Sequence, residues 1–327
     1  MTRRNLILIH RGPEYEQDFK EISEKVFVLD PEITIYSLAT GTTDQLPEAA
    51  WQWPTLTVAL NSNFNLKIRR GPVLSNYQVR KLAQHRIFRE ADIPTPPMQE
   101  FRIGMTLDPI LFGEFVILKP MSLRLTSSGK GIHLFRRRSL EKMTAKDFPA
   151  HHLVHRDAEG YLVQRFIDTG ERASDNRVST FFGRVLYANC ATAKTLRPDL
   201  RQIGVDLSGT AISSLVMESD WRWHADEDTL QLAQKVHAAF PDIPLLGTDI
   251  LREADTGKLY VLECNPGGNT WHFSSPTGRE WQFRIGRSLG ASRDMAKSAG
   301  RKMLLDQFGA IDIVAHALVE KTRELAT

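Results

Sequence analysis

Short apolar runs alternate with amphipathic stretches along the first part of the chain. Residues 5–10 have the pattern of a buried strand, and residues 15–26 carry apolar side chains at helical spacing. Residues 26–29, 33–38 and 56–60 are further strand candidates because large apolar side chains dominate them. Strands that alternate with helices predict a small α/β domain.

A proline-rich segment follows this region. Residues 78–91 predict a helix, and residues 92–97 end it because they contain three prolines, which cannot continue a helix. We expect a rigid connector and a domain boundary here.

The rest of the chain predicts hairpins and helices. The expected strands are residues 115–119, 132–135, 161–167, 177–182, 185–194, 245–252 and 259–264. The expected helices are residues 140–147, 230–240, 292–307 and 311–325. Residues 255–258 form the turn between the last two strands, which therefore predict one hairpin.

Composition places the chain among globular proteins, with 42% apolar and 25% charged residues. At 327 residues it is long enough for two or three domains with a cleft between them. The longest early apolar run, residues 6–9, is too short for a signal peptide, and no run is long enough to span a membrane. We therefore expect a cytoplasmic protein without a membrane partner.

Cysteines and net charge exclude further classes. Cys190 and Cys264 both lie in strand-like runs, which favours buried thiols over a disulfide framework or a cysteine zinc site. The net charge of +3 makes nucleic acid an unlikely partner. Residues 279–302 are strongly basic, which suits either an anionic, acidic substrate or an ordinary solvated helix face.

The predicted final hairpin carries the most specific chemistry. Glu263 and Asn265 alternate with Cys264 and Leu262, so they share one face of their strand, and the partner strand can place Asp249 beside them. Two carboxylates and an amide carbonyl are the hard oxygen ligands that Mg²⁺ takes, and Mn²⁺ could replace it. A merely acidic solvent face is the alternative, but the apolar neighbours indicate a mostly buried sheet, where unpaired carboxylates are costly.

A second group of residues suits phosphate. Lys119 ends an apolar strand, and the polar loop that follows contains Ser128, Gly129 and Gly131, whose backbone N–H groups could bind phosphates. The loop lacks the spacing of a P-loop, and a plain hairpin turn is the alternative.

Together these features resemble the ATP-grasp superfamily of carboxylate–amine ligases. The resemblance implies a mixed α/β and α+β fold in which two lobes clamp ATP, with Mg²⁺ as the metal. It places an N-terminal α/β (pre-ATP-grasp) domain at residues 1–75, a small lobe with its connecting helix at 76–160, and a large lobe with C-terminal helices at 161–327.

The resemblance also assigns nucleotide and metal residues. Lys81 matches the first nucleotide lysine of the family and Lys119 the second, which reaches the phosphates. The hinge strand that reads adenine through its backbone corresponds to Gln164, Arg165, Phe166 and Ile167, with Glu171 placed to bind the ribose, and Asp249, Glu263 and Asn265 match the metal ligands. The chain departs from the family at three positions: Arg80 replaces an acid, Arg165 a hinge glutamate, and His85 a second lysine. We expect His85 to lie on the helix surface.

Acyl transfer is expected next to the metal ligands. Arg177 resembles the family arginine that faces the phosphates or the acceptor, and Lys194 could join it on an anion, although a surface salt bridge is an equal alternative. Gly268 and Asn269 lie in a tight loop whose N–H groups could hold a tetrahedral intermediate. Trp271 and His272 follow, as a substrate wall and a base or as packing residues.

The resulting hypothesis is an ADP-forming ligase that activates a carboxylate as an acyl phosphate and joins it to an amine. Small-molecule acids and amines, among them amino acids or a peptide, are the expected substrates, and the family resemblance favours a homodimer. Two alternatives remain open: a phosphotransferase on the same scaffold, and a module that binds ATP without turnover.

Overall fold

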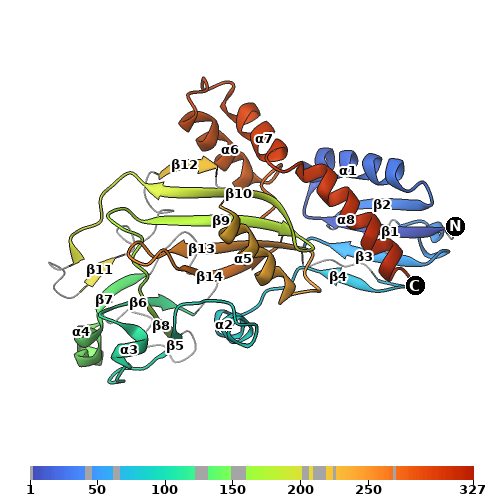
Figure 1. Cartoon of the computed structure of the whole chain (residues 1–327). Coiled ribbons are helices and arrows are strands. Elements are labelled where there is room, and N and C mark those ends of the chain that lie inside the picture. The colour runs from blue at the N-terminus through green and yellow to red at the C-terminus, as the bar shows by residue number, and fades with distance from the viewer. Residues whose placement is uncertain are drawn as a thin grey trace.

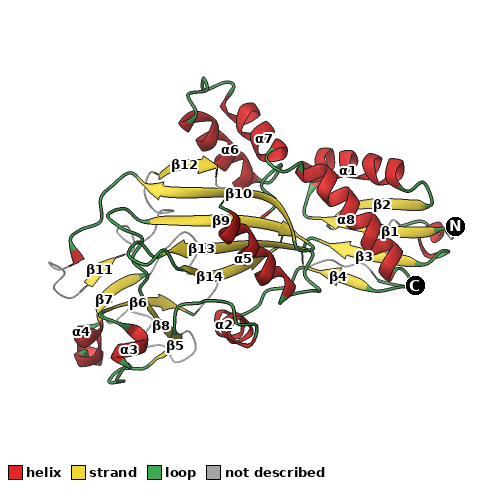
Figure 2. Ribbon diagram, in the orientation of Figure 1, coloured by secondary structure: helices red, strands yellow, loops and turns green. Residues whose placement is uncertain are grey.

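The computed structural model describes residues 3–40, 46–61, 67–121, 132–148, 160–200, 206–208, 219–223, 226–267 and 270–327. These residues form three sheets, which lie side by side across the molecule with helices packed against them (Figures 1 and 2). No helix among them is both long and apolar enough to cross a membrane.

The N-terminal sheet is parallel, with the strand order β2-β1-β3-β4. Its strands are β1 (Arg4–His10), β2 (Ile33–Ala39), β3 (Thr55–Ala59) and β4 (Val73–Ser75). Helices α1 (Glu16–Leu29) and α8 (Ala310–Leu325) pack against each other beside this sheet, so the chain returns at its end to its first strands (Figure 1).

One strand prediction in this region is wrong. Residues 26–29 are the last turn of α1, in which Val26 is buried while Phe27 and Val28 are exposed. The apolar run has the composition of a strand, but only Val26 completes the buried face of the helix. The other apolar side chains of the run lie outside that face. Strand β4 was not expected, whereas β1, β2 and β3 confirm the predicted alternation.

The central sheet is antiparallel, with the order β12-β10-β9-β13-β14. Its strands are β9 (Ser174–Phe181), β10 (Arg184–Ala193), β12 (Ser219–Trp223), β13 (Leu245–Arg252) and β14 (Leu259–Pro266). The two hairpins predicted in this region are confirmed, β9 with β10 and β13 with β14. Helices α2 (Lys81–Glu90) and α5 (Glu227–Ala238) contribute side chains to the apolar core beneath this sheet.

The third sheet has the order β11-β7-β6-β8-β5. Its strands are β5 (Met98–Phe101), β6 (Phe115–Pro120), β7 (His133–Arg136), β8 (Tyr161–Arg165) and β11 (Asp206–Ser208). The short helices α3 (Pro109–Phe112) and α4 (Arg137–Lys142) close a small core of their own with Val116, Leu118 and Val163.

The two helices that follow β14 in the chain pack closely against each other. Helix α6 (Pro276–Ser288) and helix α7 (Ala296–Asp306) meet at Gly286 and Gly300. A Cβ atom on Gly286 would lie 2.0 Å from the carbonyl oxygen of Ala296, so only glycine permits this contact. The pattern of residues 292–307 predicted α7, but α6 was missed.

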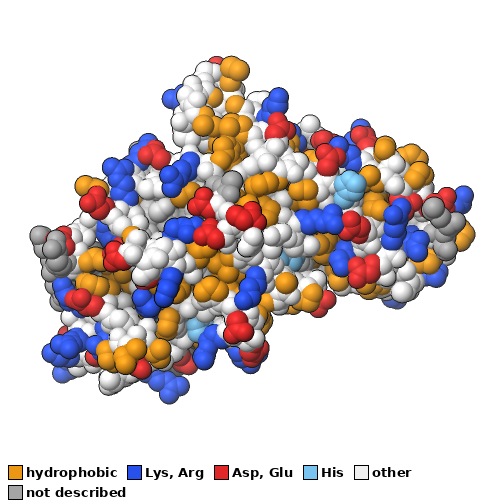
Figure 3. Space-filling view, viewed as in Figure 1, with side chains coloured by type: hydrophobic (Ala, Val, Ile, Leu, Met, Phe, Trp, Pro, Cys, Tyr) orange, Lys and Arg blue, Asp and Glu red, His pale blue; other side chains and the backbone are white. Residues whose placement is uncertain are grey.

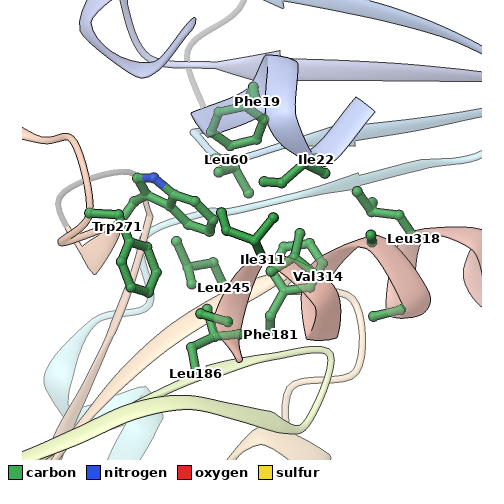
Figure 4. Close-up of a cluster of buried hydrophobic side chains, with 14 of the residues drawn as sticks. Phe19, Ile22, Leu60, Phe181, Leu186, Leu245, Trp271, Ile311, Val314 and Leu318 are labelled. Carbon is green, nitrogen blue, oxygen red and sulfur yellow. The ribbon is translucent and has the colours of Figure 1, made fainter. Parts of the chain in front are cut away.

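The largest core joins the N-terminal and central sheets. Figure 4 shows Phe19 and Ile22 of α1 and Leu60 meeting Ile311, Val314 and Leu318 of α8, with Leu245, Phe181 and Leu186 of the central sheet beyond them. Trp271 lies in the same cluster, fully buried. Burial of this many large side chains ties the segment after β14 to the N-terminal sheet.

Charged side chains of both signs are mixed on one face of the molecule. On the face seen in Figure 3, acidic and basic residues are interspersed. Within the basic stretch at 279–302, Arg284 pairs with Glu280 at 3.1 Å and Arg301 with Asp18 at 2.5 Å. These two arginines thus have structural partners.

Candidate active site

Strand register brings the candidate charged residues together. Asp249 on β13 lies opposite Glu263 on β14 and, on its other side, opposite Arg177 on β9. Asn265 lies opposite Gly247, two residues further along the same pair of strands. Directly opposed side chains in a sheet are near neighbours, so the row forms from three segments distant in sequence.

Asp249 is held by hydrogen-bond donors from two residues. The Arg177 guanidinium contacts both of its carboxylate oxygens, with Nη2 2.8 Å from Oδ2, and Asn265 Nδ2 donates to Oδ2 at 2.9 Å. Burial raises the pKa of Asp249 to about 6, and the Glu263 charge adds to this rise, whereas Arg177 and Asn265 oppose it. The carboxylate is therefore ionised at neutral pH.

A β-bulge modifies the predicted face of β14. The register shifts between Asp249 and Ile250, so Val261 rather than Leu262 packs in the core with Cys264. Simple alternation placed Leu262 and Cys264 on one face, but Leu262 is only partly buried whereas Cys264 lies in the core, because the bulge interrupts the alternation beside Glu263. Glu263 itself is partly exposed.

Two lysines approach this row from other elements. Lys81, the first residue of α2, has its Nζ atom 3.8 Å from Glu263 Oε2. Lys119, on β6, is 6% exposed, and its Nζ donates to Gln164 Oε1 at 2.9 Å. Burial and the nearby Lys81 lower the pKa of Lys119 to about 8, while Glu263 opposes the change. Burial also lowers the pKa of Lys81, again against Glu263.

The donor set suits a hard divalent cation. Asp249 and Glu263 supply carboxylate oxygens, and Asn265, whose nitrogen is bonded to Asp249, has a carbonyl oxygen. Arg177 does not exclude a metal from Asp249, because Oδ1, which accepts from Arg177 Nε, has a second lone pair.

The hinge residues are the last two residues of β8 and the two that follow it. Gln164 is buried, and its Nε2 atom has no hydrogen-bond partner in the part of the chain that the structure describes. Arg165 pairs with Glu253 at 2.9 Å, Phe166 lies under the Arg197 guanidinium, and Ile167 is buried. The unpaired donor of Gln164 and the Lys119 ammonium therefore lie together on one face of β6 and β8.

The chain is similar to known proteins in its fold rather than in its sequence. No protein-family model matches the chain, and no curated protein sequence matches it either. Among solved structures, macrocyclase MdnC from Microcystis aeruginosa MRC, bound with precursor peptide MdnA, matches with a TM-score of 0.51 and 10% identity, over 97% of this chain and 99% of that one. The ATP-grasp ligase PsnB, complexed with precursor peptide PsnA2 and AMPPNP, matches with a TM-score of 0.47 and 14% identity over 96% and 98% of the two chains.

D-alanine–D-alanine ligase from Bacillus anthracis matches with a TM-score of 0.44 and 13% identity, over 98% and 99% of the two chains. The chain has the ATP-grasp fold. This confirms the predicted mixed α/β fold class.

Several predicted residues lie apart from the row or beyond what the structure describes. Within the ATP-grasp fold, Glu171 is exposed, and the hydrogen bond found for it is from Arg197 N–H to its backbone carbonyl. Lys194 is exposed, 3.8 Å from Asp220, as the salt-bridge alternative predicted. Ser128, Gly129, Gly131, Gly268 and Asn269 lie outside the described residues.

The residues just after β14 are packing residues. Trp271 Nε1 donates to Asp18 Oδ2 at 2.9 Å, and its ring lies against Phe19. His272 is buried and contacts the Tyr187 hydroxyl. His85 was expected on the surface of α2, but it is buried with Nε2 3.1 Å from the carbonyl oxygen of Pro96, because the proline-rich connector folds back over the helix.

Three further residues near the row were not among the predicted site residues. Partial burial and the nearby Asp249 raise the pKa of Asp175 to about 7, against Arg177. Its position two residues before Arg177, on the same strand face, was a usable signal. Trp281 lies 5.7 Å from the Arg177 guanidinium, and Gln84 bonds to β14, but neither carries a local sequence signal.

One cavity lies elsewhere in the ATP-grasp fold. It has a volume of about 500 Å³ and is lined by Pro94, Leu232 and Tyr260 among others. None of the predicted site residues lines it, so we do not assign it to nucleotide binding.

Proposed function

We propose that the protein is an ATP-dependent ligase that activates a carboxylate as an acyl phosphate and joins it to an amine, releasing ADP and phosphate. One observation carries the proposal: Arg177, Asp249 and Glu263 form a row across three neighbouring strands, and the buried Lys81 contacts Glu263 at its end. The buried Lys119 is close enough for the charges of Lys81 and Glu263 to act on its pKa. Fixed charges of this kind are what phosphoryl transfer requires, since catalysis there is mostly positioning and charge stabilisation.

Asp249, Glu263 and Asn265 are the residues that would hold one or two Mg²⁺ ions, or Mn²⁺. The bound metal would neutralise charge on the transferring phosphoryl group. Arg177 keeps Asp249 oriented and ionised, and Lys81 limits the repulsion between the two carboxylates by its position near Glu263.

In the proposed reaction, a substrate carboxylate oxygen attacks the γ-phosphorus of ATP, and the bond to the bridging oxygen of ADP breaks. Lys119 stabilises the phosphoryl charge during this step through the N–H donors that Gln164 does not use. A neutral amine then attacks the acyl carbon, the C–O bond to phosphate breaks, and the amine proton leaves with the phosphate. Arg177 and Lys194 are the predicted contacts of the anionic intermediate.

The remaining predicted contacts complete the proposal. Gln164, Arg165, Phe166 and Ile167 would bind adenine, Glu171 the ribose, the loop with Ser128, Gly129 and Gly131 the phosphates, and Gly268 with Asn269 the tetrahedral intermediate. MdnC was solved with a precursor peptide, which supports testing peptides beside amino acids and other small acids. A homodimer in the cytoplasm stays our expectation.

The test is a coupled assay of ADP and phosphate release with Mg-ATP. Pools of amino acids, dicarboxylic acids and peptides serve as acids, with hydroxylamine as a surrogate amine. Glu263→Gln is compared with Glu320→Gln, since Glu320, on α8, is exposed and pairs with Arg184. We expect hydroxamate and phosphate together, lost in Glu263→Gln and unchanged in Glu320→Gln.

Two results would count against the ligase. ADP with a stable phosphorylated acceptor, and neither hydroxamate nor free phosphate, would make the protein a phosphotransferase. Mg-ATP binding by calorimetry with no ADP formed from any pool, amine or peptide would favour a module that binds ATP without turnover.

A further inference from the structure

Gln84 joins helix α2 to the strand that carries the candidate metal ligands. It is 5% exposed and lies one turn after Lys81. Its Oε1 atom accepts from the backbone N–H of Cys264 at 3.0 Å, and its Nε2 atom donates to the backbone carbonyl of Cys264 at 2.9 Å. Nε2 also donates to the carbonyl oxygen of Val79 at 3.0 Å, just before the helix begins.

Cys264, to which Gln84 is hydrogen-bonded, lies at the edge of the central sheet beside the candidate metal ligands. Cys264 lies between Glu263 and Asn265, and β14 is the edge strand of the central sheet. An edge strand has N–H and C=O groups that no neighbouring strand can pair. At Cys264 the carboxamide of Gln84 takes both groups, as a further strand would.

The same contact places Lys81. Because Lys81 and Gln84 share one turn of α2, the two bonds to Cys264 also set the helix start against β14, with Lys81 Nζ 3.8 Å from Glu263 Oε2. We propose that Gln84 is a positioning residue, which holds Glu263, Asn265 and Lys81 in the geometry that binds Mg-ATP. Its effect on Mg-ATP rests on the proposed function, whereas its effect on β14 does not.

The chain contains a matched control. Gln307, directly after α7, makes the same pair of bonds to Ala188 on β10: Oε1 accepts from the backbone N–H at 2.9 Å, and Nε2 donates to the carbonyl at 3.0 Å. Ala188 lies on β10, which β9 and β13 separate from β14. Gln307→Met therefore removes equivalent bonds away from the candidate ligands.

Two buried cysteines report on these strands separately. Cys264 lies on β14 at the Gln84 contact, and Cys190 lies on β10 two residues from Ala188. A buried thiol reacts with a labelling reagent only when its surroundings open. Labelling each cysteine under native conditions, with mass spectrometry to separate the sites, measures local opening without any nucleotide.

We expect Gln84→Met to speed labelling of Cys264 by at least about tenfold, since the backbone N–H and C=O of Cys264 both lose their partner. The labelling rate of Cys190 in this variant should stay within about twofold of the wild type. In Gln307→Met, the labelling of Cys190 should speed up and that of Cys264 should stay near the wild type. Gln84→Glu keeps an acceptor for the Cys264 N–H but cannot donate to its carbonyl. It should therefore also speed the labelling of Cys264. The Kd for Mg-ATP, measured by calorimetry, should rise at least about tenfold in Gln84→Met and stay unchanged in Gln307→Met.

If both Gln84 variants increased the labelling rates of Cys264 and Cys190 by the same factor over the wild type, the inference would be overturned. Such a result would show a general loss of stability. An equal change of Kd in Gln84→Met and Gln307→Met would overturn it as well. A wild-type protein that does not bind Mg-ATP would instead overturn the proposed function, and the labelling of Cys264 would still decide whether Gln84 holds β14.

Discussion

Arg177 on β9 and Asp249 on β13 face each other across neighbouring strands, and the guanidinium contacts both oxygens of the carboxylate. Both side chains are largely buried, and Trp281 lies against the cation. A buried charge that loses its partner is costly, so each residue keeps the other in place. The planar fork of arginine suits this two-point contact, which an ammonium cannot reproduce.

Arg177→Lys should therefore lower the rate of hydroxamate formation while the protein stays folded. We expect a loss on the order of 10- to 100-fold, or about 1.4 to 2.8 kcal/mol, because the positive charge remains but Asp249 is no longer held at two points. Arg184→Lys is the control, since Arg184 pairs with Glu320 on the surface and the pair is partly exposed. Equal rates in the two variants would refute a role for the two-point contact.

The pH dependence of nucleotide binding should report on Lys119. Its pKa is lowered to about 8 by burial and by Lys81, so the ammonium is charged below that pH and loses its proton above it. We expect the affinity of the free protein for Mg-ATP to be full near pH 7 and to fall as pH rises through about 8. Calorimetry from pH 6.5 to 9.5 measures this.

Lys119→Met should bind Mg-ATP weakly at every pH and show no fall near pH 8. The exposed Lys142, on α4, is the control position, and Lys142→Met should keep the wild-type profile. A wild-type affinity that stays level to pH 9.5 would mean that the charge of Lys119 does not act on the nucleotide.

Trp271 links the segment after β14 to the N-terminal sheet through Asp18, which also pairs with Arg301 on α7. Trp271→Phe keeps most of the apolar contact but leaves the buried Asp18 without its indole donor. The free energy of unfolding should fall by about 1 to 3 kcal/mol, which urea titration followed by circular dichroism measures. Trp53→Phe, at a partly exposed position, should change it by less than about 0.5 kcal/mol; equal losses would show that the Asp18 bond adds no stability.

The helices and strands could be predicted from the sequence wherever apolar side chains recur with one clear period, that of a helix or that of a strand. The alternation of residues 245–252 and 259–264 indicated the hairpin of β13 and β14, and the residue types at Asp249, Glu263 and Asn265 indicated oxygen ligands on it. Where two periods fit a short run, the prediction failed, as at residues 26–29, which complete helix α1. The bulge beside Glu263 was likewise invisible, because a bulge appears only when two strands are paired.

The sequence by itself determined the alternation of strands and helices and the chemistry of the final hairpin, because both depend on neighbouring residues. Only the tertiary structure decided that Arg177 holds Asp249, that Gln84 completes the edge of β14, and that Trp271 is buried against α1. Each of these contacts joins segments far apart in the chain. Such contacts depend on strand register and helix packing, which no local pattern encodes.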